Sequence, residues 1–253
     1  MQKIMGERNK HGLGRTIPAE VKRIVRKRCG FGCVRCGLAL YDYEHFDPDF
    51  KDALTHDENG ITLLCMQCNQ KRNRGVLSVE TVREANKHPK CLSDGFASET
   101  FDFGTKSMTV IVASHEFIDC CTLIAINDFP VLSIRPPENI GEPYRLSGRF
   151  ADETGEITLA IKDNVWAAGA DNWDVECVGP RIIIKNGPRR VALKIKSEPP
   201  HRIIIEQLNM QFDGIALRAE NEKFEISFDG KNWTSFVGGG VAGCNVGIDL
   251  RNR

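Results

Sequence analysis

Long apolar segments are missing from this chain of 253 residues. No run approaches the roughly 18 consecutive apolar residues typical of a membrane-spanning helix, which argues against a helical membrane protein. The first residues are polar and basic, without the apolar core of a secretory signal peptide. Hydrophobic residues make up 41% of the chain and charged residues 27%, as in soluble globular proteins. We therefore expect a cytoplasmic protein whose thiols are reduced.

The chain also has no net charge, since its 34 basic residues are balanced by 34 acidic ones. The charges are unevenly distributed along the chain. Residues 1–90 contain 17 Lys and Arg against 11 Asp and Glu, which gives +6, and the remainder carries −6. A basic half beside an acidic half indicates nucleic-acid contact by the basic half. Taken alone, the same counts fit a solvated basic surface equally well.

Four of the ten cysteines are paired in the sequence. Cys33 and Cys36 form one Cys-x-x-Cys pair, and Cys65 and Cys68 form a second. Two such pairs predict a tetrahedral structural zinc site with four thiolate ligands. The gap between the pairs is longer than in an ordinary zinc ribbon, so another element is inserted there. Cys29 has a less favourable spacing, and we interpret it as a spare thiol.

The insert and the residue after the second pair carry further polar residues. Glu44 directly precedes His45, and Asn59 lies shortly before the second cysteine pair. Asn69 directly follows that pair. With the two cysteine pairs, this arrangement resembles the HNH endonuclease family in its zinc-containing ββα-metal form, as an HNN variant, over about residues 15–75. The chain departs from the commonest family pattern by having Glu44 in place of Asp and Asn69 in place of His.

The resemblance implies a metal-dependent endonuclease that hydrolyses DNA. His45 would be the general base, because an imidazole pKa near neutrality suits proton abstraction. Glu44 and Asn69 would hold a catalytic Mg²⁺ or Mn²⁺, in addition to the structural Zn²⁺. Asn59 would fix the loop and orient His45. His56 in the same loop is either an assistant of the metal site or an ordinary polar loop histidine, with equal weight.

Basic residues near this region predict contacts with nucleic-acid phosphates. A helix is expected from Pro18 onward, with an apolar stripe that packs on the zinc module and cations that face outward. Residues 1–14 are expected to form a loose arm, whose cations Lys3, Arg8 and Lys10 are either phosphate contacts or ordinary residues of a disordered terminus. The residues expected to bind nucleic acid are Arg23, Arg26, Lys27, Lys71, Arg72 and Arg74.

The whole chain is expected to be an α+β protein with two domains. Residues 1–90 would form the HNH nuclease domain, in the order strand, loop, strand, helix. Residues 91–106 show no periodicity and are expected to be a linker. Short β-rich runs separated by turn residues then predict an all-β sandwich or barrel over residues 107–253. In this half Cys120 and Cys121 are either a redox pair or buried strand residues, and the flanking sequence favours burial.

Family habit suggests a bacterial restriction or phage-defence effector, with the β domain choosing targets, binding partners or regulating the nuclease. The expected partner is DNA, with RNA left open, and a protein or small effector is considered for the β domain. No membrane partner is expected, and the oligomeric state stays open. The rival hypothesis is a catalytically weak, zinc-containing nucleic-acid-binding module.

Overall fold

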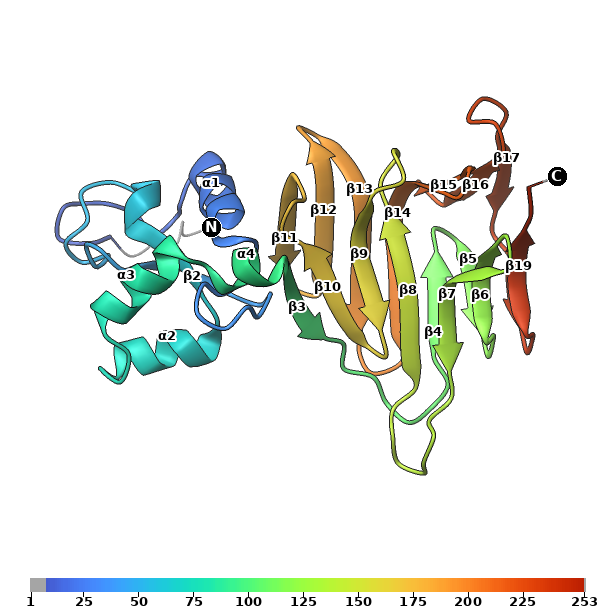
Figure 1. Ribbon diagram of the computed structural model, residues 1–253, viewed down its shortest axis with the longest axis horizontal. Helices are drawn as coiled ribbons and strands as arrows, with labels where there is room; N and C mark the ends of the chain where they lie inside the picture. The colour runs from blue at the N-terminus through green and yellow to red at the C-terminus, as the bar shows by residue number, and fades with distance from the viewer. Residues whose placement is uncertain (1–7, 253) are drawn as a thin grey trace, which may run out of the picture. The chain divides into compact units, whose positions relative to one another are not determined.

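The structure is a computed structural model that describes residues 8–252 (Figure 1). The chain divides into two compact units, Met1–Ser98 and Glu99–Arg253. About 15% of the residues are helical and 45% are in strands, so the mixed α and β composition is as expected. The α-helices of the described residues all belong to the first unit. None of these helices combines the length and the apolar character needed to cross a membrane.

The first unit is a small two-stranded sheet packed with helices. Strands β1 and β2 are antiparallel, with Glu44 opposite Thr62 and His45 opposite Ile61. A loop and a short 3-10 helix connect the two strands, and a helix follows β2, which is the expected order of elements. The elements are α1 (Ala19–Cys29), β1 (Asp42–His45), η1 (Glu58–Gly60), β2 (Ile61–Leu64), α2 (Met66–Asn73), α3 (Val79–Lys87) and α4 (Lys90–Asp94).

Helix α1 begins beside Pro18, as the sequence predicts. Pro18 is the N-cap residue, and Gly30 ends the helix in the left-handed conformation with φ 70°. Ile17 and Val25 are buried in the core of this unit, together with the fully buried strand residues of β2. The helix therefore supports the hairpin that carries Glu44 and His45.

The segment 91–106 is not the irregular linker that the sequence predicts. It holds most of α4 and all of β3 (Phe96–Thr100). The reason lies in close packing that no periodicity reveals: a Cβ atom on Gly32 would come within 2.7 Å of the Cys91 sulfur. Because Gly32 has no side chain, α4 can lie directly against the first cysteine loop.

The start of the described chain is fixed in place, unlike the loose arm expected there. The Asn9 side chain donates hydrogen bonds to the carbonyl oxygens of Phe50 and Ala53, at 2.6 and 2.7 Å. Lys10 forms an ion pair with Asp52 at 2.5 Å. Arg8 and Gly14 form an isolated β-bridge, so residues 8–14 fold back on themselves. Lys3 lies outside the described residues.

The second unit contains two sheets. The seven-stranded sheet has the order β19-β6-β7-β8-β9-β10-β3, and the ten-stranded sheet includes the path β11-β12-β13-β14-β15-β16-β17. Its strands are β4 (Thr109–Val112), β5 (His115–Ile118), β6 (Thr122–Ile126), β7 (Phe129–Arg135), β8 (Arg145–Ala151), β9 (Ile157–Lys162), β10 (Val165–Gly169), β11 (Asp174–Val178), β12 (Arg181–Gly187), β13 (Arg190–Glu198), β14 (Arg202–Phe212), β15 (Ile215–Glu220), β16 (Lys223–Ser227), β17 (Thr234–Val237), β18 (Gly240–Ala242) and β19 (Val246–Leu250).

The two sheets approach each other where β8 packs against β14, which gives a sandwich-like pair of layers (Figure 1). The long strand β14 pairs with β4 through its first half and with β15 through its second half. Ten strands of this unit coincide with the β-rich runs of the sequence, which are residues 108–113, 121–126, 131–134, 144–149, 156–161, 181–184, 190–195, 202–206, 216–219 and 224–228. Strands β5, β10, β11, β17, β18 and β19 do not coincide with such runs, because strands of only three to five residues have weak sequence signals.

Candidate functional site

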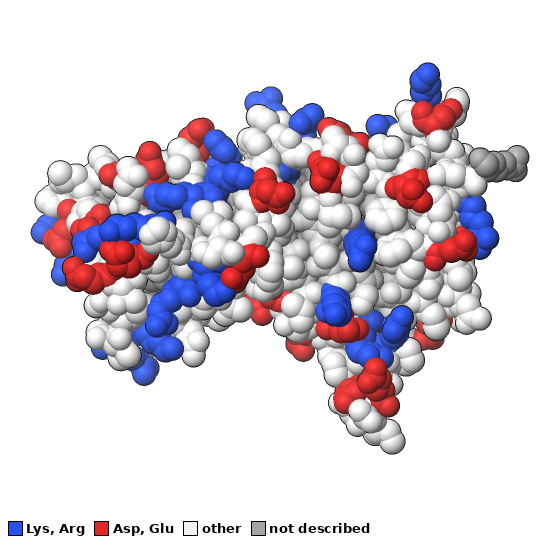
Figure 2. Space-filling view, in the orientation of Figure 1, with Lys and Arg blue, Asp and Glu red and all other residues white. Residues whose placement is uncertain are grey.

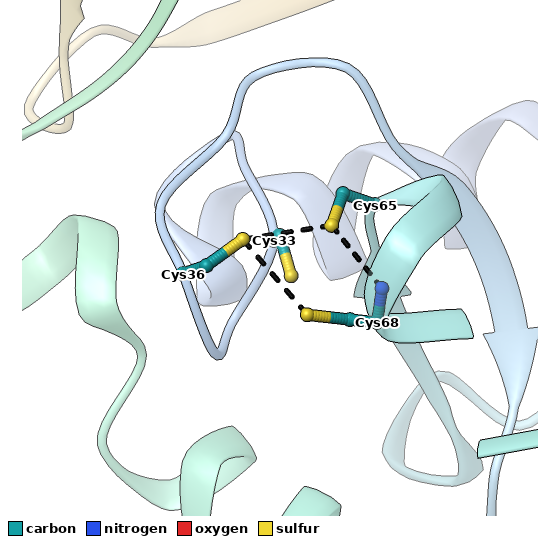
Figure 3. Close-up of side chains that lie close together, drawn as sticks. All are labelled: Cys33, Cys36, Cys65 and Cys68. Carbon is teal, nitrogen blue, oxygen red and sulfur yellow. Dashed lines mark hydrogen bonds between the residues drawn. The ribbon is translucent and has the colours of Figure 1, made fainter. Parts of the chain in front are cut away.

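The four paired cysteines converge in space, as the sequence predicts (Figure 3). The four sulfur atoms all lie within 4.8 Å of one another, and they belong to Cys33, Cys36, Cys65 and Cys68. The Cys36 sulfur is 3.5 Å from that of Cys65 and 3.9 Å from that of Cys68. Four thiolates at about 2.3 Å from a tetrahedral zinc ion would be about 3.8 Å apart. The donor set and its spacing therefore fit a structural zinc ion.

Local backbone geometry aims these sulfurs at one point. In the first loop the Cys33 amide donates to Leu38 O at 2.8 Å, and the Gly37 amide donates to Cys33 O at 2.9 Å. In the second loop Cys65 is the N-cap of α2, and its sulfur accepts from the Cys68 amide. A tight turn at each pair directs both of its sulfurs inward, which brings the end of β2 and the start of α2 to the first loop.

Crowding of the thiols separates their acidities. The Cys36 hydrogen bond is the main cause that lowers the pKa of Cys33 to about 5. Burial is the main cause that raises the pKa of Cys68 to about 11. Cys29 stays apart from this cluster: its sulfur is buried and lies 3.9 Å from the Thr62 hydroxyl. Within residues 8–252 the four-cysteine cluster is the one metal-like grouping of His, Cys, Asp and Glu, and Cys29 is a spare thiol.

His45, the expected base, is held by a second histidine. Its Nε2 lies 3.1 Å from Nδ1 of His56, and Nε2 of His56 lies 2.9 Å from the carbonyl oxygen of Gly14. The chain of contacts therefore runs from β1 through the connecting loop to the folded-back segment 8–14. These three residues are 42 positions apart at most, and only the tertiary structure joins them.

The direction of these hydrogen bonds determines where the protons are. A carbonyl oxygen can only accept, so Nε2 of His56 carries a proton and donates it to Gly14. In a neutral ring Nδ1 of His56 then accepts, and Nε2 of His45 donates to it. The proton of His45 is thereby placed on Nε2. Its Nδ1 is left as the basic nitrogen, and this atom has no hydrogen-bond partner among the described residues.

The surroundings of His45 keep its ring neutral. Burial is the largest cause that lowers the pKa of His45, followed by the charges of His56 and Arg15. The ring also packs edge-on against Phe50, with centroids 5.3 Å apart, and the Arg15 guanidinium lies over the same Phe50 ring, 4.7 Å from its centroid. A neutral imidazole with one free basic nitrogen is the form that can accept a proton.

Glu44 makes a different set of contacts from its neighbour. Consecutive strand residues point to opposite faces, and Glu44 Oε1 accepts from Arg72 Nη1 at 3.0 Å on the side of α2. Arg72 also forms an ion pair with Asp49 at 2.5 Å, and its side chain is only 10% exposed. The guanidinium is thus shared by two carboxylates. Arg72, expected to grip phosphate, is instead an internal counter-ion in this structure.

Asn69 lies beside Glu44, so the two expected metal ligands are adjacent. Burial is the main cause that raises the pKa of Glu44, while Arg72 and a hydrogen bond from the Asn69 side chain oppose it. The Asn69 side-chain oxygen Oδ1 also accepts a hydrogen bond from the Asn73 side-chain nitrogen Nδ2, at 3.5 Å. The arrangement brings one carboxylate and one amide together at the start of α2.

Asn59 does not reach His45. Its backbone amide and its side-chain nitrogen both donate to Asp57 Oδ1, at 3.0 and 3.1 Å. These bonds fix the turn into η1, which is the loop-fixing part of the expected role. Orientation of His45, the other part, falls to His56, because the exposed Asn59 side chain is already engaged with Asp57.

The expected nucleic-acid-binding residues differ in exposure. Arg26 is buried, with 6% exposure, and donates to the Tyr43 hydroxyl at 2.7 Å, so the expectation that it faces outward is wrong. The buried face of α1 includes more than its aliphatic residues, and the long Arg26 side chain covers part of that face. Lys27 and Arg74 are exposed, while Arg23 and Lys71 are partly exposed. On the face in Figure 2, basic and acidic side chains of this unit are interleaved.

Several residues of the site had no clear sequence signal. The sequence is compatible with two roles for His56, and it indicates no role in the site for Asp49 or Asn9. Asp49 contacts Arg72, which is 23 positions away in the sequence. His56 contacts His45, which is 11 positions away. Such pairings depend on how the loop folds over β1. The one signal in the sequence is the presence of two histidines, His45 and His56, near the two ends of the same loop.

Comparison of the chain with protein-family models, with curated proteins and with solved structures gives no match in any of the three. The assignment of a function therefore depends on the geometry of the site and on the resemblance carried by its residues.

Proposed function

We propose that this protein is a metal-dependent nuclease of the HNH type that hydrolyses DNA phosphodiester bonds. One observation carries the proposal: the His45–His56–Gly14 chain leaves a free basic nitrogen, Nδ1, on a neutral His45. The four-cysteine cluster supports the proposal because it would tie the first cysteine loop to the start of α2. The order of β1, β2 and α2 along the chain is the one that the family uses.

The residues of the chain would act as follows. Nδ1 of His45 accepts a proton from a water molecule, and the hydroxide attacks the phosphorus atom. A bond forms between phosphorus and the hydroxide oxygen, and the bond to the leaving sugar oxygen breaks. The positive charge that develops on His45 is shared with His56, whose Nε2 donates to Gly14 O. Lys71 and Arg74, on α2 and at its end, would contact flanking phosphates.

Glu44 and Asn69 would hold the catalytic Mg²⁺ or Mn²⁺. Two adjacent oxygen donors suit a hard cation that keeps several water ligands. Such a cation neutralises charge on the phosphate during hydrolysis. For Asn69 to contribute its oxygen, its amide would turn away from the donor orientation in which it hydrogen-bonds Glu44.

The second candidate function is a zinc-containing nucleic-acid-binding module with weak or no catalysis. It is favoured by the ion pair between Arg72 and Glu44, at 3.0 Å, because the guanidinium already neutralises the carboxylate that would bind the cation. The two functions predict different outcomes with the same substrates, so one experiment separates them.

The test is plasmid cleavage with Mg²⁺ or Mn²⁺ by the wild type and by His45→Ala, with zinc content measured on both. We expect the wild type to cut and the variant to lose at least about a hundredfold in rate, since a positioned base contributes roughly 10²–10⁴. Zinc content should be unchanged, because His45 is not a ligand of the cysteine cluster. A wild type that contains zinc and binds DNA but cuts neither DNA nor RNA would favour the binding module.

A further inference from the structure

A second pair of cysteines lies in the other unit, far from the zinc cluster in sequence. Cys120 is in the segment between β5 and β6, and Cys244 is in the segment between β18 and β19. Both thiols are free in this structure. Their sulfurs are 2.7 Å apart, closer than the 3.5 Å between Cys36 and Cys65 in the zinc cluster. The residues are separated by 124 positions, so the fold alone brings them together.

The surrounding backbone keeps these two segments in register. Strand β18 pairs with β5 in parallel, and β19 pairs with β6 in parallel. Between the two pairings, the Gly243 amide donates to Ile118 O at 3.0 Å, and the Cys121 amide donates to Cys244 O at 3.2 Å. The cysteines sit where both segments pass from one sheet to the other. Their proximity therefore follows from four paired strands and is not an accident of one flexible side chain.

A small molecule can reach the pair. Cys120 is buried with 4% exposure, but its side chain lines a cavity of about 170 Å³ with Cys121, Asp119 and Tyr144. Cys244 is partly exposed. The neighbouring Cys121 is exposed, and its thiol is not in hydrogen-bond contact with either sulfur. Of the three thiols, Cys120 and Cys244 are the two that meet.

We propose that Cys120 and Cys244 form a redox latch, which a low-molecular-weight disulfide such as oxidised glutathione closes. One thiolate of the pair attacks a sulfur of the reagent, forms a mixed disulfide and releases one glutathione thiolate. The second thiol loses its proton and attacks the protein sulfur of the mixed disulfide, which releases the second glutathione. The two protein thiols are oxidised by two electrons, one reagent disulfide is reduced, and a thiol such as reduced glutathione reverses the reaction.

Closing the latch would fasten the C-terminal strands to the body of the unit. Strand β18 has three residues, all exposed, and β17 is exposed throughout, so few buried side chains hold this region. A cross-link between residues 124 positions apart restricts the unfolded chain strongly. For a unit of this size we expect the melting temperature of the unit to rise by about 10 °C on oxidation.

The experiment equilibrates the full-length, zinc-loaded protein in glutathione buffers from fully reduced to fully oxidised. Free thiols are then blocked with N-ethylmaleimide, and tryptic peptides are analysed by mass spectrometry with and without reduction. We expect one linked pair of peptides, which contain Cys120 and Cys244 and are lighter by two hydrogens than the sum of the free-thiol peptides. The melting temperature of the second unit should rise in parallel.

Matched variants identify the thiols, because Cys120 and Cys121 share a tryptic peptide. Cys121→Ser should keep the link and the shift in melting temperature, whereas Cys120→Ser and Cys244→Ser should each abolish both. Cys244 is only partly buried, so Cys244→Ser remains informative if Cys120→Ser fails to fold. The latch is overturned if Cys121→Ser loses the link while Cys120→Ser keeps it. Absence of any Cys244-linked peptide under fully oxidising conditions would overturn it as well.

Discussion

A histidine acts as a base only if one ring nitrogen is unprotonated and open to the substrate. In His45 the unprotonated nitrogen is Nδ1, because His56 accepts the hydrogen bond from Nε2 of His45 at 3.1 Å and donates one to Gly14 O at 2.9 Å. Other tautomers would put the proton on the nitrogen that has to act. At this scale the candidate chemistry therefore depends on a residue to which the sequence assigned no firm role.

Replacement of His56 tests that dependence. We expect His56→Ala to lower the cleavage rate by about tenfold to a hundredfold, because His45 loses the acceptor that fixes its tautomer and orientation. His56→Gln should recover part of the rate, since its amide can accept from His45 and donate to Gly14. The measurements are single-turnover cleavage and zinc content, with His88→Ala as the matched surface control. Equal rates for His56→Ala and the wild type would contradict the role.

Arg72 and Arg74 lie two residues apart and should behave differently. Arg72→Met leaves Glu44 and Asp49 without their shared cation, so we expect the free energy of unfolding to fall by roughly 1–3 kcal/mol, allowing for the exposure of Asp49. Arg74→Ala should leave stability unchanged and reduce the slope of log affinity against log salt by about one, as for one lost phosphate contact. Thermal melts and DNA-binding titrations at several salt concentrations measure both.

Reversed outcomes would revise the assignment of these two residues. If Arg72→Met is as stable as the wild type but binds DNA more weakly, Arg72 serves the nucleic acid and the ion pair is dispensable. If Arg74→Ala changes neither quantity, α2 does not face the phosphates.

Among the elements, the loop between β1 and β2 is the one that brings the site together. It carries Asp49, His56 and Asn59, and its return is fixed where Gly60 O accepts from the Phe46 amide at 3.0 Å. A Cβ atom on Gly60 would come within 2.6 Å of Asp47 O, a backbone atom that cannot move away cheaply. The loop thus requires glycine at this position through a close approach of two backbones.

Gly60→Ala should therefore damage the hairpin. We expect a loss of about 1–3 kcal/mol in the free energy of unfolding, as for other overpacked sites, and a fall in cleavage as His56 shifts. Gly14→Ala is the matched control for stability, since nothing lies within 4 Å of the position of its Cβ. Chemical denaturation of the two variants gives the comparison. A Gly60→Ala protein with the stability of the control would show that the loop adapts.

For the molecule as a whole, metal binding and the two units should be separable. The zinc cluster joins the first cysteine loop to α2 and belongs entirely to the first unit. The second unit has its own two sheets and does not contribute a cysteine to the cluster. Structural zinc contributes about 10–16 kcal/mol of binding free energy that is coupled to folding.

Removal of zinc by a strong chelator should unfold the first unit and spare the second. We expect the helical circular dichroism signal to fall, because the α-helices of the described residues lie between residues 19 and 94. Hydrogen exchange followed by mass spectrometry should show lost protection before residue 98 and retained protection in the sheets. Zinc added back should restore both signals. Retained protection in the first unit after complete zinc loss would show that its apolar core is sufficient.

The sequence by itself determined the four-cysteine cluster, which could bind a metal such as zinc, and most of the longer strands. Ligand spacing and short-range periodicity are local properties, and so is the N-cap residue Ser78 that precedes α3. It also placed Glu44, His45 and Asn69 in one unit, because β1, β2 and α2 follow one another along the chain.

Only the tertiary structure decided what those residues contact. Arg26 turns inward to Tyr43, Arg72 is shared by two carboxylates, and His56 rather than Asn59 holds His45. The Cys120 and Cys244 sulfurs meet across 124 positions. Each of these pairings links segments that are distant along the chain, and the partner of a long polar side chain is set by which backbone the fold brings beside it. Local sequence patterns therefore do not predict these partners.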